Sequence, residues 1–76
     1  MYHEATFAES EKERAAQTFH STARQAAQVA SDAAVKRLLI GHYSSRYDTP
    51  DILLNEAREL FPDTIAAKEG MVINID

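Results

Sequence analysis

The chain has 76 residues, eight basic against twelve acidic side chains, a net charge of −4 and no cysteine. This length allows one domain over residues 1–76, with little stability in reserve, because a short chain buries a modest fraction of its surface. The absence of cysteine excludes disulfides and thiolate zinc sites and suits a reducing cytoplasm. No apolar run is long enough for a membrane span or a secretion signal, so no membrane contact is expected. The negative charge argues against a general nucleic-acid-binding surface, so any RNA contact is expected to be local.

The first predicted elements are a strand end and a short helix. The segment from Tyr2 to Thr6 is interpreted as the last part of a strand. Ser10 and Glu13 have the spacing of a capping box, in which two side chains satisfy backbone N–H groups at the start of a helix. A short helix is therefore expected over residues 10–18, with an acidic first turn that suits the positive end of the helix dipole.

A second helix is expected to begin just after His20. Ser21 and Thr22 are good N-caps, and Gln25 stands three positions beyond Thr22, as a capping box requires. Alanines then recur at helical spacing and form a narrow stripe, which predicts close packing against a sheet. The stripe consists of Ala23, Ala26, Ala27, Ala30 and Ala34.

A buried central strand is predicted over Val35 to Gly41. Leu38, Leu39 and Ile40 follow one another without alternation, which is typical of a strand covered on both faces. His42 is expected to lie at the C-terminal end of this strand.

A third helix is predicted to begin at Thr49, Pro50 and Asp51. These residues supply a hydroxyl cap, a proline in the first turn and an acid at the positive end of the dipole. The helix is expected to end at Pro62. Its predicted inner face consists of Ile52, Leu53, Ala57 and Leu60.

The last segments, Thr64 to Ala67 and Met71 to Ile75, are interpreted as a hairpin or a strand with a bulged return. The element order is therefore β-α-α-β-α-β-β, which describes a small α/β fold. In such sheets ligands gather at the carboxyl ends of strands. Glu4, His20 and His42 all fall at such places, so their side chains are expected to converge.

Four short stretches of the sequence resemble the C-terminal end of ribonuclease Z. They are HEATF from His3, HST from His20, GHYSSRY from Gly41 and EARELFP at Glu56 to Pro62. That family consists of zinc-dependent endonucleases of the metallo-β-lactamase superfamily, which trim the 3′ end of transfer RNA precursors. The family's metal motif HxHxDH occurs nowhere in these 76 residues. The resemblance therefore implies the C-terminal part of a metallo-β-lactamase fold.

The resemblance also implies a role for each convergent residue. His42 matches the family's last zinc ligand, although Gly41 stands where the family usually has a threonine whose hydroxyl could orient the site. His20 matches the residue thought to protonate the leaving oxygen or stabilise its charge, and imidazole suits proton transfer because its usual pKa lies near neutrality. Glu4 is the carboxylate expected to orient His20. On the residues alone, His42 could instead cap a strand end, and His20 could lie exposed outside a helix cap.

Phosphate contacts are predicted at two further places. Ser21 and Thr22 could hold a phosphate at a helix N-terminus, where backbone N–H groups and the dipole favour anions, and helix capping is the alternative. Arg46 could contact phosphate or a base, or it could form a surface ion pair with Asp48. His3 is expected to face away from Glu4 across the strand and to be structural.

In a complete enzyme these residues would help to form a two-zinc site that cleaves precursor transfer RNA. Most metal ligands would then come from a missing N-terminal segment. The isolated chain is expected to be a truncated or split segment that neither hydrolyses RNA nor binds zinc tightly. The alternative is a stand-alone interaction module, which would form a homo-oligomer or bind a partner through an uncovered sheet edge and helix face.

Overall fold

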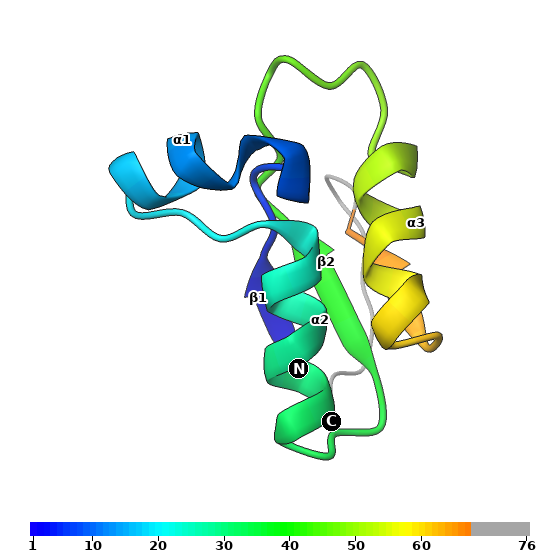
Figure 1. Ribbon diagram of the computed structural model, residues 1–76. Helices are drawn as coiled ribbons and strands as arrows, with labels where there is room; N and C mark the ends of the chain where they lie inside the picture. The colour runs from blue at the N-terminus through cyan, green and yellow to red at the C-terminus, as the bar shows by residue number, and fades with distance from the viewer. Residues whose placement is uncertain (68–76) are drawn as a thin grey trace.

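The computed structural model describes residues 1–67, which form a small α/β unit. Its elements in chain order are β1 (Tyr2–Glu4), the 3₁₀ helix η1 (Glu9–Glu11), α1 (Lys12–Gln17), α2 (Ala23–Asp32), β2 (Leu38–Gly41), α3 (Asp51–Leu60) and β3 (Thr64–Ala66) (Figure 1). The predicted α/β order is confirmed through β3. The strand expected over Met71 to Ile75 lies outside the described residues.

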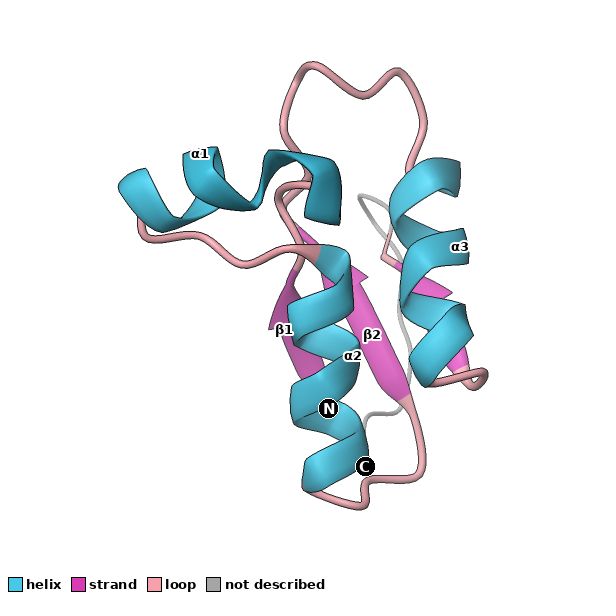
Figure 2. Cartoon of the chain, viewed as in Figure 1, coloured by secondary structure: helices cyan, strands magenta, loops and turns pink. Residues whose placement is uncertain are grey.

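The three strands form one parallel sheet in the order β1-β2-β3, so β2 is the central strand, as predicted. Glu4 pairs with Gly41 across β1 and β2, and Leu38 pairs with Thr64 across β2 and β3. All three strands point the same way, so their carboxyl ends meet at one edge of the sheet. Helices α2 and α3 lie side by side along the sheet, and α1 projects away near that carboxyl edge (Figure 2).

The alanine stripe of α2 forms much of the core. Ala23, Ala26, Ala27 and Ala30 are fully buried, and their small side chains let the helix approach the sheet closely. The inclusion of Ala34 in the stripe was wrong. The helix ends at Asp32, and Ala34 is exposed with a left-handed φ of 55°.

The start of α2 follows the sequence prediction. Thr22 is the N-cap, its side chain accepts a hydrogen bond from the Gln25 N–H, and the Gln25 side chain accepts from the Thr22 N–H. The capping box predicted at Ser10 and Glu13 was wrong, because the chain enters a 3₁₀ turn there and neither η1 nor α1 has a side-chain cap. The backbone N–H of Glu9 is satisfied from a distance instead, by the carboxylate of Glu56.

One boundary and one face differ from the sequence prediction. The central strand begins at Leu38 rather than Val35. In α3, Leu53 is fully buried, but Ile52 is 61% exposed. Leu53 and Leu60 stand seven residues apart on one helical face, and Ile52 lies about 100° away from Leu53 around the helix axis. None of the helices in residues 1–67 has the length and apolarity needed to cross a membrane.

Candidate functional site

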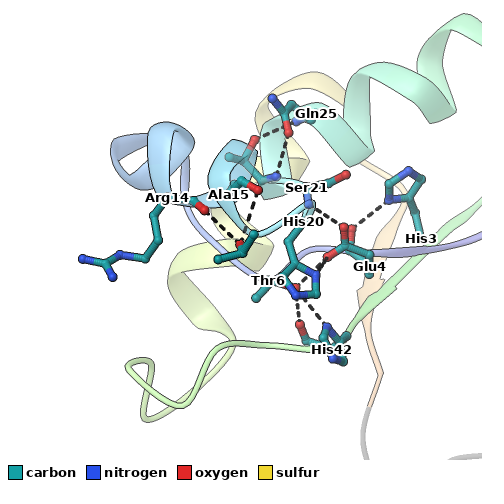
Figure 3. Close-up of polar contacts among 11 residues, drawn as sticks. His3, Glu4, Thr6, Arg14, Ala15, His20, Ser21, Gln25 and His42 are labelled. Carbon is teal, nitrogen blue, oxygen red and sulfur yellow. Dashed lines mark hydrogen bonds and ion pairs between the residues drawn. The ribbon is translucent and has the colours of Figure 1, made fainter.

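Three side chains that are far apart in the sequence meet at the carboxyl edge of the sheet. Glu4 ends β1, His20 lies between α1 and α2, and His42 follows β2. One potential ligand atom from each residue lies within 4.8 Å of the other two. Glu4 and His20 are half-buried and His42 is exposed, so the cluster opens to solvent. Figure 3 shows the three side chains close to one another. The structure thus brings together the three residues that were expected to converge.

The end of α1 brings His20 to this cluster. The His20 N–H donates to the carbonyl of Ala15 at 2.8 Å, and the Phe19 N–H donates to the carbonyl of Ala16 at 3.4 Å. Phe19 has a φ of 60°. These two bonds around a left-handed residue form a Schellman motif, which ends the helix and reverses the chain. The reversal directs His20 back toward the sheet.

Glu4 is held by donors on both carboxylate oxygens. The Thr6 hydroxyl donates to Oε2 at 2.6 Å, and the Ser21 N–H donates to Oε1. The His20 Nδ1 lies 3.7 Å from Oε2. Burial by itself would raise the pKa of Glu4, but these hydrogen bonds from Thr6 and Ser21 and the nearby His20 outweigh it and hold that pKa below its usual range. Glu4 is therefore an ionised carboxylate at neutral pH.

His42 lies in a left-handed turn directly after β2, with a φ of 60°. Its Nδ1 is 3.0 Å from the Thr6 hydroxyl oxygen, which also lies 2.8 Å from the His42 carbonyl oxygen. The rings of His20 and His42 are tilted against each other with centroids 5.0 Å apart. Sequence reasoning missed Thr6, although its signal is present: it stands two residues after Glu4, so both side chains leave an extended segment on the same face.

Gly41 leaves room for a neighbouring aromatic ring. A Cβ at Gly41 would lie 2.5 Å from the Tyr2 hydroxyl oxygen and 2.9 Å from its Cε2. A threonine at this position would therefore require the Tyr2 ring to move. The missing hydroxyl has a counterpart nearby, because Thr6 supplies one to the same turn.

The start of α2 has no backbone donor left for a phosphate. The N–H groups of Thr22 and Gln25 bond within the capping box, that of Ala23 donates to the Phe7 carbonyl, and that of Arg24 donates to Glu56. The Thr22 side chain is fully buried. These contacts support the capping alternative for Thr22, and a phosphate there would also meet a carboxylate.

Ser21 contributes to the cluster through its backbone N–H, which bonds to Glu4. Two acidic residues that sequence reasoning missed also hold this region: Glu9 accepts from the Thr22 hydroxyl at 2.7 Å, and Glu56 accepts from the Arg24 N–H at 2.9 Å. No local pattern could identify them, because Glu56 lies 32 residues from Arg24.

Arg46 is connected to the cluster through the ring of Phe7. Its guanidinium stands over the ring of Phe7, 5.8 Å from the centroid, and Phe7 meets His20 edge-on at 6.3 Å. The ion pair that Arg46 forms is with Glu11 at 3.6 Å and not with Asp48, the partner that one of the two alternatives named.

His3 stays apart from the cluster of three. Its Nδ1 lies 2.7 Å from the Glu4 carbonyl oxygen, which makes it a partner of the strand backbone. Its ring is seen beside that carbonyl in Figure 3.

Comparison with known proteins gives one consistent result. The chain is 54% identical over 76 residues to the ribonuclease Z of Phocaeicola vulgatus, 54% over 76 residues to that of Bacteroides thetaiotaomicron and 57% over 75 residues to that of Parabacteroides distasonis. These matches cover 99–100% of the chain but 24–25% of each relative, so the chain spans about a quarter of the length of the curated relatives. No protein-family model matches the chain. The predicted resemblance to ribonuclease Z is confirmed.

Proposed function

We propose that this chain forms the C-terminal part of a cytoplasmic zinc endonuclease. The whole length of the chain matches a C-terminal segment of ribonuclease Z. The substrate of the whole enzyme would be precursor transfer RNA, cleaved at its 3′ side. In this proposal His42 is a zinc ligand, His20 is the catalytic acid and Glu4 orients His20. The observation that carries the proposal is the convergence of these three side chains within 4.8 Å.

The donor set fits zinc. Imidazole nitrogens and carboxylate oxygens are the protein ligands of many catalytic zinc sites, so an exposed imidazole at this edge suits such an ion. His42 is the residue we assign to the metal, because its ring is exposed whereas His20 faces Glu4. One histidine does not hold zinc tightly, so the other ligands would belong to the rest of the enzyme.

Each residue of the cluster would have a separate task. Zinc, when bound, supplies hydroxide near neutral pH and offsets charge on the phosphodiester. The Nδ1 atom of His20 faces Glu4 at 3.7 Å, which leaves Nε2 to face the substrate. From there His20 would give a proton to the leaving oxygen as the bond from phosphorus to that oxygen breaks. Glu4, fixed by Thr6 and Ser21, would hold the ring in this orientation.

A chimera tests this proposal. The chain replaces the corresponding quarter of the Bacteroides thetaiotaomicron relative, and cleavage of precursor transfer RNA is measured together with bound zinc. We expect the chimera to cleave. His20→Ala should lower kcat by about 10²- to 10⁴-fold with zinc content unchanged, whereas His42→Ala should lower both zinc content and cleavage.

His3→Ala is the matched control, because His3 neighbours Glu4 in β1 but contacts a backbone carbonyl. It should leave zinc content and cleavage close to those of the unsubstituted chimera. Undiminished cleavage by the His20 variant, or full zinc content in the His42 variant, would contradict the assigned roles. Metal-dependent turnover by the isolated 76-residue chain would contradict the proposal that most ligands lie elsewhere.

A second candidate is an interaction module that self-associates. It is favoured by large apolar side chains that are exposed within residues 1–67. They are Tyr2, Phe19, Val29 and Ile52. Light scattering on the isolated chain separates the two candidates: a folded, stable oligomer favours the module, whereas a monomer or a polydisperse aggregate favours the enzyme segment.

A further inference from the structure

We propose that Thr6 is a positioning residue that fixes which ring nitrogen of His42 carries the proton. Its hydroxyl oxygen lies 2.6 Å from Glu4 Oε2, 3.0 Å from His42 Nδ1 and 2.8 Å from the His42 carbonyl oxygen. Thr6 is 5% exposed, so water has little access to replace these contacts. One buried hydroxyl therefore joins the carboxylate and the proposed metal ligand.

The number of protons decides the direction of each bond. A hydroxyl has one proton and two lone pairs, and an ionised carboxylate can only accept. The charged Glu4 oxygen is a stronger acceptor than the neutral carbonyl of His42, because charge-assisted hydrogen bonds are roughly twice as strong as neutral ones. The two oxygens that can only accept, Glu4 Oε2 and the His42 carbonyl, compete for the single Thr6 proton, and Glu4 is the stronger acceptor. With the proton on either of them, a lone pair of the Thr6 hydroxyl faces His42 Nδ1.

This direction selects one tautomer of His42. Facing a lone pair of Thr6, Nδ1 forms a favourable contact only as a donor, so it carries the proton in the neutral ring. The other nitrogen, Nε2, then has its lone pair free. The hydrogen bond at one ring nitrogen commonly sets the state of the other in this way.

The backbone around Thr6 holds this arrangement in place. The Ser44 N–H donates to the Thr6 carbonyl at 3.0 Å, and the Ala5 N–H donates to the Gly41 carbonyl at 2.8 Å. These bonds fasten both sides of the left-handed turn at His42 to the segment that carries Thr6. The fold thus places the buried Thr6 hydroxyl within hydrogen-bond distance of His42 Nδ1.

The tautomer of His42 does not depend on the proposed function. Only its consequence, that Nε2 is the nitrogen that binds zinc, rests on that function. The tautomer can be measured without metal. We would record long-range ¹H–¹⁵N spectra of the histidine rings in the full 76-residue chain at about pH 8.5, above the usual imidazole pKa of roughly 6.5. We expect a protonated Nδ1 and an unprotonated Nε2 for His42.

Three variants separate positioning from general stability. Thr6→Val removes the hydroxyl at constant shape. We expect the ratio of the Nδ1-protonated to the Nε2-protonated form of His42 to fall about fivefold, the effect of losing one hydrogen bond. Thr6→Ser restores a hydroxyl and should restore the ring signals. Thr64→Val is the matched control, because the buried Thr64 hydroxyl donates to the Phe61 carbonyl and does not touch the site.

The measurement on the unsubstituted chain decides the question even if Thr6→Val does not fold. The inference would be overturned if the His42 ring is protonated at Nε2 or gives ring signals like those of an unfolded chain. It would also be overturned if folded Thr6→Val has the same tautomer ratio as the unsubstituted chain. Bound zinc in the chimera reports separately on the proposed function. If the expected tautomer is found but the His42→Ala chimera keeps its full zinc content, the positioning role of Thr6 is supported and the role of His42 as a zinc ligand is contradicted.

Discussion

Phe19 occupies a backbone position that usually belongs to glycine. It has a φ of 60° at the end of α1, and its side chain is 94% exposed. A left-handed backbone costs an L-residue roughly 1–2 kcal/mol, whereas glycine adopts it freely but loses more conformational entropy on folding. We expect Phe19→Gly to raise the free energy of unfolding by about 0.5–1 kcal/mol, as measured by urea denaturation.

Phe19→Ala provides the control for this prediction. Alanine removes the exposed ring but keeps the Cβ that disfavours the left-handed backbone, so it should change the stability little. Equal stabilisation by both variants would show that the exposed ring, and not the backbone conformation, is the source of the cost.

Glu4 makes the stability depend on pH in the acidic range. Its pKa is held below the usual range because hydrogen bonds from Thr6 and Ser21 outweigh the effect of burial. A carboxylate with a lower pKa in the folded state contributes stability above its unfolded pKa of about 4.3, and this contribution is lost as the pH falls through the folded pKa. We therefore expect Glu4→Gln to lose less stability than the unsubstituted chain between about pH 5 and pH 3.

Urea midpoints at several pH values within this range would measure the difference. Glu13→Gln is the control for the removal of one negative charge, since Glu13 is exposed on α1. An identical pH dependence for the chain with and without Glu4→Gln would contradict the assigned hydrogen bonds.

At the scale of elements, one carboxylate joins three helical segments. Glu56 on α3 accepts from the Glu9 N–H at 2.9 and 3.0 Å and from the Arg24 N–H at 2.9 Å. It thus ties α3 to the start of η1 and to the first turn of α2. Because hydrogen bonds to charged groups contribute about 1.5–3 kcal/mol each when well ordered, and this site is partly exposed, we expect Glu56→Ala to cost about 1–3 kcal/mol.

Chemical denaturation of Glu56→Ala and Glu59→Ala would test this tie. Glu59 is exposed on the same helix and has the same helix-forming tendency, so its replacement controls for the loss of a glutamate from α3. We expect Glu59→Ala to stay within about 0.5 kcal/mol of the unsubstituted chain. Equal losses from the two variants would contradict the role of Glu56.

The sequence predicted a helix start correctly where the side chains that cap the helix lie in the same turn as the backbone N–H groups they bond. Thr22 and Gln25 form the predicted capping box because both partners belong to the same turn. Ser10 and Glu13 have the same spacing, yet Ser10 lies inside η1, where it cannot take the extended backbone conformation of an N-cap. Spacing predicts a cap only where the backbone leaves the cap residue outside the helix.

The same distinction explains the candidate site. Glu4, His20 and His42 were expected together because a parallel sheet brings strand ends to one edge and the resembling stretches fall there. The spacing of Thr6 from Glu4 is a signal for their contact, but the contact of Thr6 with His42, 36 residues away, has no local signal. The position of Arg46 over Phe7 likewise depends on tertiary packing, which cannot be predicted from the charged residues around Asp48.

At the scale of the whole molecule, the core of the described residues is built mainly from small side chains. Its largest fully buried apolar side chains are Leu38, Ile40 and Leu53, and four alanines of α2 fill much of the remainder. A 76-residue chain has a typical free energy of unfolding of about 4–11 kcal/mol. Each large side chain in such a core therefore carries a considerable part of the total stability.

Leu53→Ala tests this dependence. Truncating a buried leucine costs about 2–5 kcal/mol, because the transfer of its side chain from water is lost and a cavity remains. We expect the urea midpoint followed by circular dichroism to fall by about half, or the chain to lose cooperative unfolding. Ile52→Ala is the matched control one residue earlier on α3, where the side chain is 61% exposed, and its cost should stay below about 1 kcal/mol. A large loss of stability from Ile52→Ala in the monomeric chain would mean that this outer face of α3 is covered in solution. A small loss of stability from Leu53→Ala would mean that the sheet and helices hold together without the Leu53 side chain.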